Sequence, residues 1–140
     1  MEIVNRAARY NYYIEDEYEC GIVLVGTEIK SIRNSHCSIK DSYVRIKNNE
    51  AYIINMYIDK DQNATIFNHD EYRERKLLLH KKEIIKLKQK VTEGGYTLVP
   101  LKLYFKDNHI KLLIGVGKGK KNYDKRETIK QRDLERANKI

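Results

Sequence analysis

The sequence has 140 residues, a length typical of one domain, and 28 Lys and Arg against 20 Asp and Glu leave a net charge of +8. Residues 118–140 carry nine of the basic and four of the acidic residues, so the charge gathers at the C-terminal end. This distribution indicates a polyanionic partner, or else a solubilising tail. With no apolar leader, no run near the ~20 residues of a membrane span and two cysteines, we expect a soluble cytoplasmic protein with free thiols.

The first third of the chain predicts two short helices separated by an extended segment. Residues 5–10 form the first helix, with Asn5 as its N-cap. Residues 10–25 are rich in Tyr, Ile and Val, and the run at 22–25 is typical of a strand buried on both faces. Thr27 follows Gly26 and is expected to cap the second helix.

The middle of the chain predicts a hairpin, a loop and a longer helix. Asn48-Asn49 is the expected turn between two strands, the second of which places Tyr52, Ile54, Met56 and Ile58 on one face. Residues 59–75 are polar and are expected to form an irregular loop. A helix follows and ends at Gly94-Gly95, with a stripe of Ile84, Leu87 and Val91.

The clearest pattern is the last hairpin, which turns at residues 106–108. Its strands place these residues inward: Val99, Leu101, Leu103, Phe105, Ile110, Leu112, Ile114 and Val116. Pro100 marks an edge or a bulge. The expected fold is mainly β with short helices: an OB-like barrel over 1–117, a helix inserted before the last hairpin, and a flexible basic tail over 118–140.

Signals of an enzyme are weak. The four histidines (36, 69, 80 and 109) are not spaced as metal ligands, and the glycines at 115–119 complete neither a dinucleotide fingerprint nor a P-loop. The densest acid-base set is at 68–75, where a general acid-base pair is possible but a solvated loop is favoured. We expect no catalysis, no metal and no cofactor.

Signals of nucleic-acid binding are stronger. Arginines and tyrosines interleave near the N-terminus, at Arg6, Arg9, Tyr10 and Tyr12, which suits phosphates and exposed bases. Lys118, Lys120 and Lys121 stand beside glycines on an expected flexible run. The tail has helix-forming residues but a thin apolar stripe, so it should be disordered when free and helical in an acidic groove.

Several stretches together resemble the family of SmpB, which binds transfer-messenger RNA in bacteria. They are NRAARYNYYIEDEYECGIVLVGTEIKSIR, DSY, NHDEYRERKLLLHKKEI, GYTLVPLKLYF, KLLIGVGKGKK and YDKRETIKQRD. The resemblance implies that the barrel binds the tRNA-like part of that RNA and that the complex travels with elongation factor Tu and GTP to a stalled ribosome. We expect the protein itself to be a monomer. It also implies that the tail enters the empty decoding centre and mRNA channel.

Residue roles follow from the resemblance by position. The residue pattern and the resemblance together give the implied RNA-binding residues, which are Arg6, Arg9, Tyr10, Tyr12, Glu19, Lys30, Arg33, Tyr43, Leu78, Lys111, Lys118, Gly119, Lys120 and Lys121. The implied ribosome-contacting residues of the tail are Tyr123, Asp124, Lys125, Arg126, Ile129, Lys130, Arg132 and Arg136.

Two alternatives remain open, and four positions depart from the family pattern. The departures are Ser35, His36, Glu71 and Gly117. One alternative is a general RNA-binding OB protein or RNA chaperone, which would bind many single strands equally well. The other is an RNA-cleaving enzyme that uses His69, Asp70 and Glu71.

Overall fold

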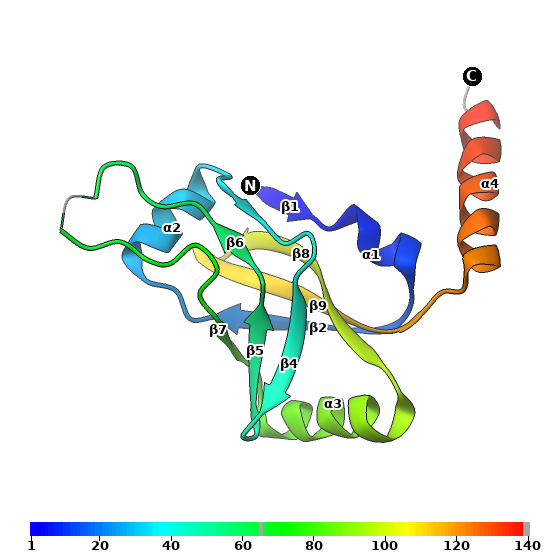
Figure 1. The fold of residues 1–140 in the computed structure, drawn as a ribbon, viewed down its shortest axis with the longest axis horizontal. Coiled ribbons are helices and arrows are strands. Elements are labelled where there is room, and N and C mark those ends of the chain that lie inside the picture. The colour runs from blue at the N-terminus through cyan, green and yellow to red at the C-terminus, as the bar shows by residue number, and fades with distance from the viewer. Residues whose placement is uncertain (65, 139–140) are drawn as a thin grey trace.

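The structure, a computed structural model, describes the backbone of residues 1–64 and 66–138, and the side chains of these except 128, 131 and 133–138. Seven strands form one antiparallel sheet in the order β1-β8-β9-β2-β7-β5-β4 (Figure 1). Their bounds are β1 Glu2–Val4, β2 Tyr12–Ile22, β4 Tyr43–Lys47, β5 Glu50–Ile54, β7 Arg75–Leu78, β8 Thr97–Lys106 and β9 His109–Gly119. A second, two-stranded sheet pairs β3 Cys37–Ser38 with β6 Tyr57–Ile58.

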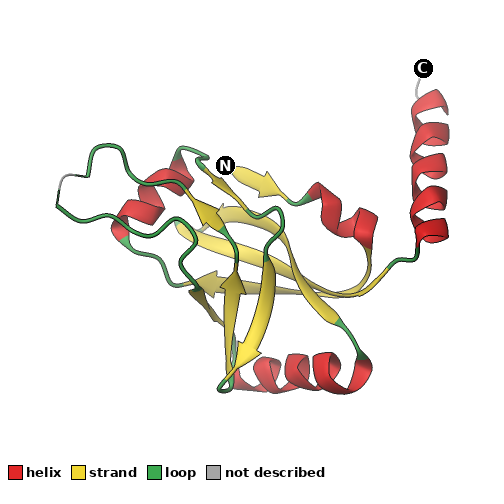
Figure 2. Cartoon of the chain, viewed as in Figure 1, coloured by secondary structure: helices red, strands yellow, loops and turns green. Residues whose placement is uncertain are grey.

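Of the helices that the described residues form, three lie beside the sheet and the last stands away from it (Figure 2). They are α1 Arg6–Asn11, α2 Gly26–Arg33, α3 Lys81–Gly94 and α4 Asn122–Asn138. The sheet curls so that β4 lies close to β8, which gives a partly open barrel. The predicted class is confirmed, because the fold is mainly β and α3 precedes the last hairpin. The tail is helical here and stands away from the sheet, whereas its disorder in the free protein stays a prediction.

The last hairpin has the predicted strands and a bulge at Pro100. Asp107 and Asn108 both have positive φ angles, 51° and 64°, and close the turn. The register shifts between Pro100 and Lys102, and this extra residue inverts the alternation of the strand. Before and after the bulge, Leu98 and Leu103 therefore enter the main core. The predicted inward residues Val99 and Leu101 pack in a second cluster with Ala8 of α1 instead.

The hairpin β4–β5 turns at Asn48-Asn49 as predicted, but the predicted face of the second strand is wrong. Asn55 has a φ of 64°, and this left-handed residue ends β5 and reverses the alternation. Ala51 and Ile53 are consequently buried before it, and Met56 and Ile58 after it.

The strand expected to be buried on both faces through residue 25 ends earlier. β2 stops at Ile22, and the side chain of Val23 is 43% exposed. Helix α2 then begins at Gly26, and Thr27 is not its cap. The Glu28 carboxylate accepts the Val25 N–H at 2.9 Å instead, because a glutamate on the first turn can reach back to that unpaired donor.

Candidate RNA-binding surface

Four residues form one row across four adjacent strands. Tyr104 of β8 pairs with Lys111 of β9, Lys111 pairs with Gly21 of β2, and Gly21 pairs with Leu78 of β7. Directly paired residues point to the same face of a sheet, so Tyr104, Lys111 and Leu78 surround a position without a side chain. The sheet thus brings together Lys111 and Leu78, two residues implied to bind RNA.

The missing side chain of Gly21 leaves a hollow of about 320 Å³. A Cβ atom at Gly21 would lie 3.3 Å from the Leu78 side chain, so a larger residue would crowd this site. Arg33, from the end of α2, lines the hollow together with Leu78 and Lys111. Leu78 is 54% exposed, which is unusual for a leucine on an inner strand and leaves an apolar surface beside two cations.

Glu19 lies two residues before Gly21 and joins this surface through β8. Its carboxylate accepts a hydrogen bond from the Tyr104 hydroxyl and another from Lys106 Nζ at 3.3 Å. The Tyr104 hydrogen bond is the main cause of a lowered pKa of Glu19. Burial, and then the contact with Glu19, raise the pKa of Tyr104. At neutral pH Glu19 is therefore an ionised carboxylate, and Tyr104 keeps its hydroxyl proton.

A second set of implied residues lies around α1. Tyr12 and Tyr43 line one hollow of about 320 Å³, while Arg6 and Arg9 line another of about 510 Å³. Arg9 also donates to Glu17 Oε1 at 2.5 Å. This arrangement offers aromatic faces and cations side by side, the pair of groups that unpaired nucleotides need.

Lys30 stands apart from both sets. It lies on α2, where its ammonium is 3.8 Å from Asp61 Oδ2, and its side chain is 71% exposed. Lys30 therefore reaches solvent on the helix that also carries Arg33.

The segment that leaves the barrel, residues 118–120, begins with regular strand structure that the sequence did not predict. Strand β9 runs to Gly119, so Lys118 and Gly119 pair with Tyr13 and Tyr12 of β2 and do not belong to a flexible run. The long pairing between β2 and β9 carries the strand two residues past the predicted boundary at 117. Lys118 Nζ lies 4.6 Å from the centre of the Tyr96 ring, and Lys120 Nζ lies 4.8 Å from that of Tyr13.

Helix α4 carries the implied tail residues. Tyr123 and Ile129 are 62% and 44% exposed. Asp124 accepts the Lys121 N–H at 3.3 Å at the start of the helix, and Lys130 Nζ is 3.9 Å from Glu127. Lys125 and Arg132 both lie 5.9 Å from the Tyr10 ring. Arg126 is exposed, and the side chain of Arg136 lies outside the described residues.

A protein-family model described as "SmpB protein" matches residues 2–139. The chain belongs to the SmpB family. Relatives named SsrA-binding protein from Staphylococcus aureus strains Newman and NCTC 8325 / PS 47 are each 55% identical over 132 residues, which is 94% of this chain and 86% of theirs. A solved structure described as "tmRNA-SmpB: a journey to the center of the bacterial ribosome" aligns with a TM-score of 0.71 at 43% identity. It covers 86% of this chain and 85% of that one.

The acid-base set at 68–75 is only in part the solvated loop that the sequence favoured, because Asp70, Tyr72 and Glu74 are exposed whereas His69 and Arg75 are buried. His69 is 3% exposed, and its ring lies between Thr27 Oγ1, at 2.8 Å from Nδ1, and the Ile58 carbonyl, at 3.0 Å from Nε2. A carbonyl only accepts, so Nε2 donates to Ile58, while Nδ1 and the Thr27 hydroxyl share a hydrogen bond. Both ring nitrogens are occupied, which favours a structural role for His69 over general acid-base chemistry.

Arg75 and Glu28 form a buried ion pair beneath the same loop. Arg75 Nε lies 2.5 Å from Glu28 Oε2, and its Nη1 donates to the Met56 carbonyl at 2.6 Å. Arg73 binds the other Glu28 oxygen at 2.5 Å. These contacts join α2 to β7, to the loop at Arg73 and to the segment between β5 and β6.

Within residues 1–64 and 66–138, no helix combines the length and apolar character of a membrane span. The described side chains also contain no group of three His, Cys, Asp or Glu residues that could hold a metal ion.

Sequence reasoning missed Tyr104 and Lys106 as parts of this surface. Both side chains point outward from β8, and the alternation in the sequence predicted this for Tyr104. Their contact with Glu19, however, spans 85 and 87 positions and crosses the intervening strand β9. Predicting this contact would have required the register in which β8, β9 and β2 pair.

Proposed function

We propose that this chain binds the tRNA-like part of transfer-messenger RNA and delivers it to stalled ribosomes, where unfinished proteins are tagged. The observation that carries the proposal is the likeness of 86% of the chain to a protein solved as tmRNA-SmpB, at 43% identity. Family membership over residues 2–139 supports it independently.

The geometry supports recognition of a folded RNA rather than of charge alone. Leu78 and Gly21 shape an apolar hollow between Arg33 and Lys111, and Glu19 adds a fixed carboxylate. A carboxylate repels phosphate, so its presence at an RNA surface costs affinity unless it accepts a specific donor from a base or a ribose. This surface is therefore suited to a specific RNA shape.

The tail has a separate task in this proposal. Its exposed residues from Tyr123 to Arg132 contact ribosomal RNA in the empty decoding centre and mRNA channel, while the barrel keeps the transfer-messenger RNA. The chain acts as a monomer in the cytoplasm, and elongation factor Tu with GTP accompanies it through the RNA. It performs no catalysis itself.

The test is binding to transfer-messenger RNA, a matched tRNA and an unstructured RNA at two salt concentrations. A preference for transfer-messenger RNA that survives the higher salt supports shape recognition. Lys111→Ala and Leu78→Ala should weaken this preference, whereas Lys88→Ala removes an exposed lysine from α3 and serves as the control.

Equal binding of all three RNAs that collapses with salt would instead favour a general RNA binder. Cleavage of labelled RNA that is lost in His69→Ala would favour the enzyme. Since His69 is buried, that variant needs a check of its folding, such as far-UV circular dichroism.

A further inference from the structure

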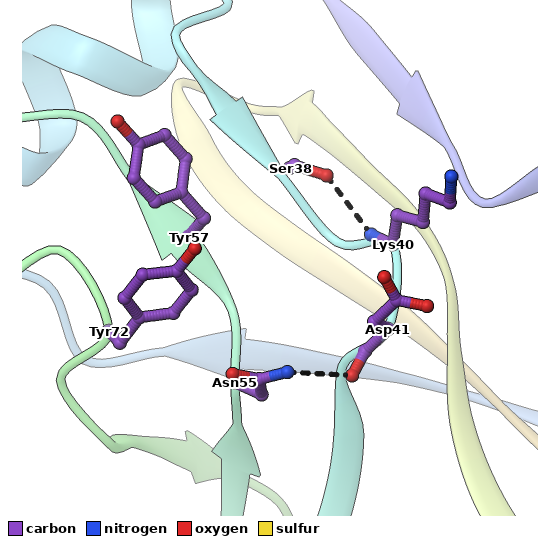
Figure 3. A pocket seen from close by; sticks show the side chains of 6 residues that line it. All are labelled: Ser38, Lys40, Asp41, Asn55, Tyr57 and Tyr72. Carbon is purple, nitrogen blue, oxygen red and sulfur yellow. Dashed lines mark hydrogen bonds between the residues drawn. The ribbon is translucent and has the colours of Figure 1, made fainter.

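A hollow of about 350 Å³ lies on a part of the surface that the implied RNA-binding residues do not include. Figure 3 shows the two rings on one side, Ser38 at the end of β3 with Lys40 and Asp41 of the β3–β4 connection on the other, and the Asn55 amide below. The lining residues are Ser38, Lys40, Asp41, Asn55, Tyr57 and Tyr72. Its volume is at the lower end of the range for small-ligand sites, about 300–1,000 Å³.

The aromatic side of the hollow offers a stacking surface. The rings of Tyr57 and Tyr72 lie 5.3 Å apart at an interplanar angle of 52°. The Tyr57 hydroxyl donates to Asp59 Oδ1 at 3.1 Å, which holds that ring in place. Tyr72 is 56% exposed, so much of this ring remains open to a planar ligand.

The opposite side is held by two hydrogen bonds to its backbone, from Asn55 to the Asp41 carbonyl and from the Lys40 N–H to Ser38, and it carries two charged side chains. Asp41 and Asn55 have φ angles of 63° and 64°, and Asn55 Nδ2 donates to the Asp41 carbonyl at 3.1 Å. In the part of the chain that the structure describes, no protein group binds the Asp41 carboxylate or the Lys40 ammonium. An acceptor and a cation without a described protein partner therefore lie on the side of the hollow opposite the exposed ring (Figure 3).

We propose that this hollow binds the guanine base of an unpaired RNA nucleotide. The base stacks on Tyr72, and its N1–H and N2 amino group donate to the two oxygens of Asp41, while Lys40 meets a phosphate. Adenine presents a lone pair at N1 and no amino group at C2, so the same carboxylate repels it. The inference rests on the proposed RNA-binding function.

The position of Asp41 supports an RNA strand as the ligand. Asp41 also lines the neighbouring hollow, which contains Tyr12 and Tyr43. A nucleotide in the first hollow therefore places the next nucleotide of its strand near two further aromatic side chains. Both hollows are thus lined by aromatic rings, on which successive bases of a single-stranded RNA can stack.

The experiment measures binding of the full chain to the RNA pentamers UUGUU and UUAUU by fluorescence anisotropy and by NMR. UUGUU should bind about tenfold more tightly, as expected for one bidentate contact to a base. Asp41→Asn should abolish the difference, and Tyr72→Ala should weaken both pentamers. Asp107→Asn, at an exposed turn residue with positive φ, is the control for Asp41, and Tyr72→Phe is the control for Tyr72.

Equal affinity for the two pentamers, or a preference that survives Asp41→Asn, overturns the proposal. NMR shifts at Asp41 and Tyr72 produced by N-acetyl-arginine amide but by neither RNA also overturn it, in favour of a basic protein partner. Binding of transfer-messenger RNA is measured in parallel. If it persists while the pentamers fail, only this inference is lost, and if both fail, the proposed function is lost as well.

Discussion

Arg75 and Glu28 form an ion pair at 2.5 Å in which both side chains are fully buried. The pair joins β7 to α2 across 47 positions of sequence. Burial alone would raise the pKa of Glu28, but the hydrogen bonds from Arg73, from the Val25 N–H and from Arg75 lower it overall. Glu28 is therefore ionised in the folded protein well below neutral pH.

Glu28→Gln should lower the free energy of unfolding by about 3–5 kcal/mol at pH 7, because it leaves the buried Arg75 without its countercharge. A carboxyl whose pKa is lower in the folded state stabilises the protein above its unfolded pKa. This contribution is lost as the pH falls through the folded pKa. Urea unfolding at pH 7 and at decreasing acid pH measures both effects, and the gap between variant and parent should narrow in acid.

Glu74→Gln is the matched control for this prediction. Glu74 pairs with Lys47 at 2.6 Å, but both side chains are about 40% exposed. Its loss should cost less than about 1 kcal/mol. Equal losses in the two variants would show that the buried pair contributes no more than a surface pair.

Tyr104→Phe should raise the pKa of Glu19, since the Tyr104 hydroxyl is the main cause of its lowering. NMR titration of the Glu19 carboxyl carbon measures the change directly. If Tyr104 positions Glu19 for RNA, the variant also weakens transfer-messenger RNA binding. Tyr96→Phe removes the hydroxyl that donates to Glu15 at 2.6 Å and should change neither property. An unchanged pKa in Tyr104→Phe would refute the contact.

The combined variant Asp124→Ala, Lys125→Ala and Arg126→Ala should keep transfer-messenger RNA binding within about twofold and lose tagging. The barrel residues that line the hollow at Gly21 do not include these three. A control with the same change in net charge replaces Lys86, Lys88 and Glu93, which are exposed on α3, by alanine and should still tag. Gel-shift binding and a reconstituted tagging assay give the two readouts. Loss of RNA binding in the tail variant would end the proposed division of labour.

Leu87→Ala should cost about 2–5 kcal/mol, because this side chain is 0% exposed and its loss leaves a cavity under α3. Val91 belongs to the same predicted stripe but is 40% exposed, so Val91→Ala should cost below about 1 kcal/mol. Urea unfolding of the two variants compares them. Similar losses would mean that Val91 also packs in the core.

Both thiols should react slowly with a disulfide reagent at pH 8. Burial raises the pKa of Cys20 to about 12 and that of Cys37 to about 11, so few thiolates form in the folded protein. In urea both cysteines should react at the rate of an ordinary thiol with a pKa of about 8.5. A fast native reaction at either position would contradict the burial.

Several elements were predictable from the sequence because their causes are local. The turns at Asn48-Asn49 and Asp107-Asn108 need residues that tolerate positive φ, and Gly95 ends α3 with a φ of 68° for the same reason. The alternation of the last strand set its buried face. The motifs that resemble the SmpB family indicated the same function as the family match and the related solved structure.

Other features needed the tertiary structure, because they depend on which distant segments meet. The bulge at Pro100 inserted one residue, and Asn55 adopts a left-handed conformation after β5; at both places the buried side chains change from one set of alternate positions to the other. The row from Tyr104 to Leu78 exists only because β8, β9, β2 and β7 pair in one register. Local residue preferences account for the turns and the helices, because these need only neighbouring residues. Long-range strand pairing decided which carboxylate, cation and aromatic ring share a surface.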